Sequence, residues 1–85
     1  MALALTMRDG HKVMIGASTY TVVDVLNGLE FSIIGPSGKF AINCNSWVEI
    51  ADGVKVQAGI PRNVAGVLVR LVIDADRSIN IFLVK

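Results

Sequence analysis

The sequence predicts an all-β fold, a small antiparallel sheet or barrel of about seven or eight short strands. β-branched valine, isoleucine and threonine recur along the chain, and these residues suit a pleated strand better than a helix. Turn dipeptides such as Asp9-Gly10 and Asn27-Gly28 divide the chain at the short spacing that is typical of small sandwiches and barrels. Because the chain has only 85 residues, we expect one domain over residues 1–85.

The first predicted hairpin occupies the start of the chain. Residues 2–8 alternate between apolar and smaller or polar side chains, which indicates a strand with one buried face. Asp9-Gly10 then predicts a type I′ turn, because that turn needs two residues that tolerate a positive φ. Residues 12–15 form the short return strand of this predicted hairpin.

The strongest hairpin signal lies in the middle of the chain. Asn27-Gly28 is the dipeptide that two-residue hairpin loops prefer, and it joins the predicted strands 19–26 and 29–34. Further predicted strands are separated by short turns or polar breaks and comprise residues 39–43, 47–50 and 54–58.

The last third predicts a long hairpin, with residues 64–73 and 79–84 as its arms and residues 74–78 as its turn. Apolar residues occupy both faces of each arm, which is typical of strands buried on both sides. In a chain this short, we expect another subunit to cover the second face of each arm. The residues expected at this interface are Val67, Val69, Leu71, Ile73, Ile79, Ile81, Phe82 and Leu83, together with the lone tryptophan, Trp47.

The composition also predicts self-association. Hydrophobic residues make up 53% of the chain and the mean hydropathy is +0.61, whereas a domain of this size buries only about two thirds of its unfolded surface. The surplus apolar surface predicts an intertwined or side-by-side homo-oligomer.

Because the sequence has no uninterrupted run of roughly 20 apolar residues, we expect no membrane span. It shows no targeting segment either, so we expect a cytoplasmic or virion location.

Residues that could carry catalysis are scarce. His11 is the only histidine and Cys44 the only cysteine, and nucleophilic catalysis also needs a group that orients the base. Asp74 and Asp76 could offer carboxylates to a cation, but this segment lacks the glycine and the terminal glutamate of a calcium-binding loop. We therefore predict a non-enzymatic protein with no cofactor and no metal site.

The start of the chain resembles the carbon storage regulator (CsrA/RsmA) family. The matching residues are Leu3, Leu5, Thr6, Gly10 and the run Met14-Ile15-Gly16. The likeness is clear over residues 3–28 and looser as far as residue 50, so residues 1–50 form the CsrA-like part and residues 51–85 an additional strand and C-terminal hairpin. The family's proline turn could correspond to Gly35-Pro36 or to Pro61.

The resemblance implies an intertwined homodimer that binds GGA-containing messenger RNA leaders and controls their translation. In that family arginines carry the RNA contacts, from the first strand of one subunit and the fifth of the other. Here Met7 stands where the first arginine is expected, and each lost bidentate arginine contact removes about 1–3 kcal/mol of base discrimination. The RNA-binding candidates that the resemblance implies are Thr6, Arg8, Lys12, Arg62 and Arg70.

Two functional hypotheses follow. The first is a non-enzymatic structural protein, a self-associating β component that decorates or stabilises a larger protein assembly such as a phage capsid. The alternative is a CsrA-like post-transcriptional regulator that binds RNA. The formal net charge of +1 favours the first, because binding of phosphates by charge requires a basic excess.

Overall fold

The computed structural model describes residues 2–27, 29–59 and 68–84, and it confirms the predicted all-β fold. The described chain forms nine strands, one more than the upper end of the predicted number. In chain order they are β1 (Ala2–Met7), β2 (Lys12–Ile15), β3 (Ser18–Asn27), β4 (Glu30–Gly35), β5 (Gly38–Asn43), β6 (Val48–Ala51), β7 (Val54–Gly59), β8 (Val69–Asp74) and β9 (Ile81–Val84).

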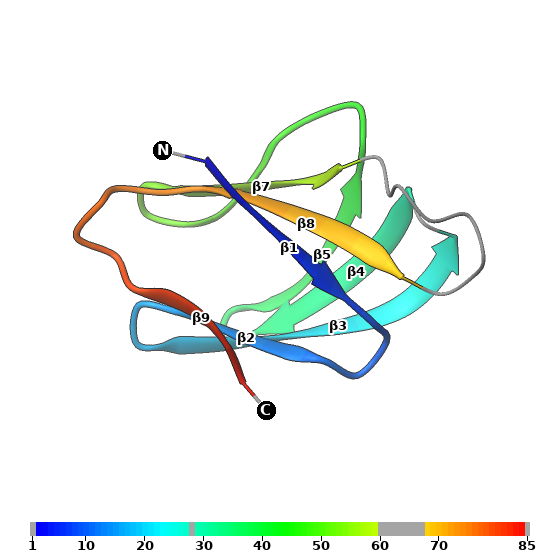
Figure 1. Ribbon diagram of the computed structural model, residues 1–85, viewed down its shortest axis with the longest axis horizontal. Helices are drawn as coiled ribbons and strands as arrows, with labels where there is room; N and C mark the ends of the chain where they lie inside the picture. Colours follow the sequence, from blue (N-terminus) through cyan, green and yellow to red (C-terminus); the bar gives the residue numbers. More distant parts are fainter. Residues whose placement is uncertain (1, 28, 60–67, 85) are drawn as a thin grey trace.

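The strands form two antiparallel sheets that face each other across one core (Figure 1). One sheet has the order β1-β8-β7-β6 and the other the order β5-β4-β3-β2-β9. On one side of the sandwich β5 lies against β6 and β7, and Gln57 Nε2 donates a hydrogen bond of 3.2 Å to the Cys44 carbonyl. The strands at the other side are β1 and β9.

Alternating side chains of both sheets fill the core. The five-stranded sheet contributes Val13, Ile15, Tyr20, Val22, Phe31, Ile33 and Ile42, and the four-stranded sheet contributes Met7, Ile50, Val54, Val56, Ala58, Val69, Leu71 and Ile73. The Tyr20 ring covers the backbone of Gly35 on the neighbouring strand, where a Cβ atom would collide with it. Every buried side chain in the described ranges is apolar or aromatic.

The hairpins predicted in the middle of the chain are confirmed. β3 pairs with β4, and β4 pairs with β5 through the two-residue loop between Gly35 and Gly38. β3 departs from a regular strand between Val23 and Asn27, where its register against β4 shifts. Asp24 lies in this irregular stretch with a φ of 50°, and its carboxylate forms an ion pair with Lys39 on β5.

The predicted hairpin at the start of the chain is wrong, because β1 and β2 belong to different sheets. β1 pairs with β8, and β2 pairs with β3 and β9. The turn after β1 is held by β3 instead: Gly10 donates to the Val22 carbonyl over 2.7 Å, and Val22 donates to the His11 carbonyl over 2.9 Å. These bonds lead the chain from one sheet to the other, so Asp9-Gly10 marks a turn between sheets.

The predicted C-terminal hairpin is wrong for a similar reason. β8 lies between β1 and β7, whereas β9 lies at the end of the other sheet beside β2. Ala75 follows β8 and is buried in the core, so the chain crosses the sandwich after this residue. Segments from both ends of the chain share each sheet, because β1 joins the C-terminal strands and β9 joins the N-terminal ones.

Strand β8, which the sequence places at an interface, contributes to the core of the single chain. Its residues Val69, Leu71 and Ile73 are 0% exposed within the single chain, so no part of them is accessible to a second copy. Arg70, Val72 and Asp74, on the outer face of β8, are half-buried. The core face of β8 is apolar and completely buried, because β8 is a central strand with β1 and β7 on its two sides.

Replacement of Leu71 with alanine tests this assignment. Leu71 lies between Leu5 of β1 and Ala58 of β7 in the sheet register, and the Leu71→Ala change leaves a cavity in a closed core. We expect the free energy of unfolding to fall by about 2–5 kcal/mol, measured by chemical denaturation. Leu26→Ala is the control, because Leu26 is 76% exposed. A loss below about 1 kcal/mol at Leu71 would contradict the burial of β8.

Candidate interaction surface

Strand β9 is an apolar edge strand. It pairs with β2 in the register Ile15↔Ile81, Met14↔Phe82, Val13↔Leu83 and Lys12↔Val84. In the described part of the chain β2 is its only neighbour in the sheet, so its other edge carries no partner strand. Such an edge presents backbone N–H and C=O groups to any strand that approaches it.

Both faces of β9 expose apolar side chains. Leu83 lies opposite the buried Val13, so it points to the core side of the sheet, but it is still 39% exposed because β9 is the last strand. Phe82 and Val84 point to the outer side and are 52% and 40% exposed. This four-residue strand therefore exposes more apolar surface than a protected edge would.

Hydrogen bonds in the preceding turn position β9. The Asp76 carboxylate accepts hydrogen bonds from the backbone N–H of Ser78, at 3.0 Å, and from its hydroxyl, at 3.1 Å. Ile79 donates to the Asp76 carbonyl, and Gly16 donates to the Asn80 carbonyl over 2.8 Å, which holds the start of β9 next to β2. The two bonds from Ser78, the backbone one first, lower the pKa of Asp76 below its ordinary value.

The neighbouring edge strand, β1, adds to the same side of the sandwich. Leu3 and Leu5 lie opposite the buried Ile73 and Leu71, so they face the core side, yet Leu3 is exposed and Leu5 only half-buried. Leu3 also lines a small cavity of about 180 Å³ together with residues of the β8–β9 connection. The core is thus incompletely covered between β1 and β9.

The remaining residues of the predicted interface have different positions. Ile79 and Ile81 pack partly against the core next to the exposed side of β9. Trp47 is exposed immediately before β6, in the other sheet. Val67 lies outside the described residues. Sequence reasoning missed Val84 and Leu3, although the alternation in both terminal segments continues through them.

The structure brings together two of the five RNA-binding candidates. Thr6 and Arg70 are directly opposite each other on β1 and β8, on the outer face of the four-stranded sheet. The Arg70 side chain extends over Gly59, whose missing side chain leaves room for it. Arg8 is exposed beyond the end of β1, and Lys12 is exposed on β2 of the other sheet. Arg62 lies outside the described residues.

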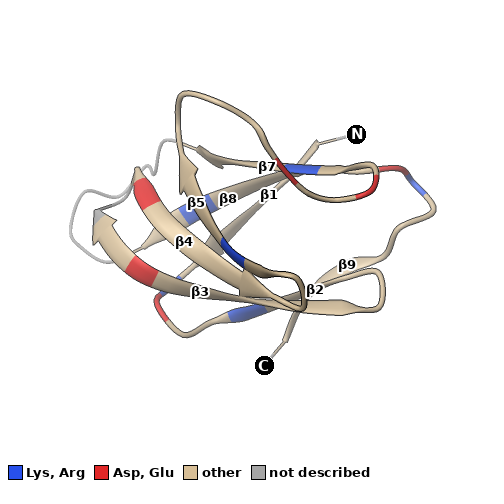
Figure 2. Ribbon diagram, turned by 180° about the vertical axis from the view of Figure 1, so that it is seen from behind, with Lys and Arg blue, Asp and Glu red and all other residues tan. Residues whose placement is uncertain are grey.

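Charges are dispersed over both sheets. Figure 2 shows basic and acidic positions interspersed over the ribbon, on neighbouring strands and turns. On the outer face of the four-stranded sheet, for instance, Lys55 pairs in register with Glu49 on one side and Asp74 on the other. A long polyanion would therefore meet carboxylates among the cations on this face.

His11 and Cys44 each make a contact with a residue close to them in the sequence. The Nδ1 atom of His11 accepts a hydrogen bond of 3.3 Å from the Arg8 backbone, and Cys44 contacts Asn45 at a sulfur–oxygen distance of 3.8 Å. Within residues 2–27, 29–59 and 68–84, no three His, Cys, Asp or Glu side chains are placed to hold a metal ion.

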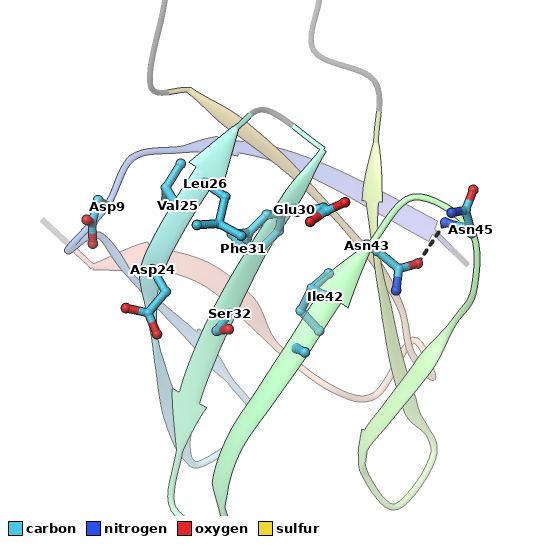
Figure 3. Close-up of a pocket in the computed structure, with 11 residues that line it drawn as sticks. Asp9, Asp24, Val25, Leu26, Glu30, Phe31, Ser32, Ile42, Asn43 and Asn45 are labelled. Carbon is cyan, nitrogen blue, oxygen red and sulfur yellow. Dashed lines mark hydrogen bonds between the residues drawn. The ribbon is translucent and has the colours of Figure 1, made fainter.

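A second surface feature is a shallow cleft of about 650 Å³ beside the irregular part of β3 (Figure 3). Asp24 and Glu30 line it, together with Asn43, whose side chain accepts a hydrogen bond of 2.8 Å from the Asn45 backbone. The carboxylate of Asp24 is paired with Lys39. Two of the polar side chains of this cleft, Asp24 and Asn43, therefore take part in a local ion pair and a local turn.

The turn before β9 yields a test based on titration. Because the pKa of Asp76 is lowered in the fold, its contribution to stability is present above the pKa of the unfolded chain and is lost as the pH falls through the folded value. We expect Ser78→Ala to raise the Asp76 pKa towards its ordinary value, measured by NMR titration of the carboxyl carbon. Ser37→Ala, in the β4–β5 turn, is the control. An unchanged Asp76 pKa in Ser78→Ala would refute the role of this hydroxyl.

The described residues contain no helix that is long and apolar enough to cross a membrane.

Comparison of the chain with protein-family models, with curated proteins and with solved structures finds no significant match. The resemblance to the carbon storage regulators therefore stays a prediction, carried by the residues at the start of the chain.

Proposed function

We propose that the chain is a non-enzymatic structural protein that associates with copies of itself through β9. The observation that carries the proposal is the exposure of Phe82, Leu83 and Val84 on both faces of a strand that lies at the end of its sheet. Burial of apolar surface drives most protein association, and an open strand edge adds directional backbone hydrogen bonds.

The other sheet edges support this choice of strand. β5 and β6 each carry a charged residue, Lys39 and Glu49 respectively, and charges on an edge strand oppose pairing with another chain. β9 and β1 contain no charged residue and no proline. The two unprotected edges thus lie on the same side of the sandwich.

Decoration of a larger assembly such as a phage capsid, in the virion or the cytoplasm, is the finer prediction within this proposal.

Replacement of Phe82 with lysine tests the self-association. Phe82→Lys places a charge on the apolar edge without disturbing a buried side chain, so we expect the wild type to form oligomers at micromolar concentration and the variant to be monomeric. Analytical ultracentrifugation over a concentration series measures both, and circular dichroism checks the fold. Leu26→Lys is the matched control, because it adds the same charge at an exposed leucine of β3. A wild type that is monomeric at every concentration would exclude the proposal.

RNA binding is the second candidate function, and one observation favours it. Thr6 and Arg70 form a cross-strand pair on an exposed sheet face, and the resemblance at the start of the chain implies RNA contacts on the first strand. An arginine that is positioned over a sheet can form bidentate hydrogen bonds with a guanine. The near-neutral net charge leaves little electrostatic attraction to add to such contacts.

A titration with a GGA-loop RNA at two salt concentrations distinguishes the two functions. If the chain binds RNA, we expect sub-micromolar, salt-sensitive binding that depends on the GGA sequence. Arg70→Ala should then weaken it by about 1–3 kcal/mol, roughly 5- to 150-fold. Lys39→Ala, on the five-stranded sheet, serves as the control. Absence of binding by the wild type at low salt would exclude this function.

A further inference from the structure

We draw no further inference here: the strongest candidate, the cleft beside β3 that Asp9, Asp24 and Glu30 line, is a cluster of carboxylates in which Asp24 is already paired with Lys39, and nothing else in the described part of the chain points to a ligand there.

Discussion

The packing of β8 between β1 and β7 is the interaction on which the rest of the structure depends. Its Leu71 is completely buried and lies in register with Leu5 and Ala58, so the last third of the chain completes a sheet that the first strand begins. Because a central strand is covered on both edges and on its core face, β8 uses its apolar residues inside the molecule. The burial of β8 accounts for part of the apolar content, while other large apolar side chains stay exposed.

The remaining surplus lies at the ends of the chain. β1 joins the four-stranded sheet and β9 the five-stranded sheet, and both become edge strands on the same side of the sandwich. The opposite side is closed by contacts of β5 with β6 and β7, and the edges there carry Lys39 and Glu49. The contrast between an apolar, uncharged edge on one side and charged edges on the other is the basis of the proposed self-association through β9.

Local signals predicted the parts of the fold that depend on neighbouring residues. The pairings of β3 with β4 and of β4 with β5 were predicted from turn residues between the strands, because turn geometry sets the pairing of adjacent strands. Asn27, predicted in the turn, is instead the last residue of β3 and pairs with Glu30. Pairings between distant segments, such as β1 with β8, leave no such local signal. The candidate site was half predicted for this reason: Phe82 and Leu83 are exposed as expected of an interface, whereas Val69 and its neighbours on β8 are core.

The sequence by itself determined the all-β class, the central hairpins and the excess of apolar residues, because these depend on composition, on alternation and on turn residues. Only the tertiary structure decided which apolar strand is covered. β8 and β9 both belong to the apolar last third of the chain, although the outer face of β8 also carries Arg70 and Asp74. Position in the sheet distinguishes them, since a strand between two neighbours buries what an edge strand exposes.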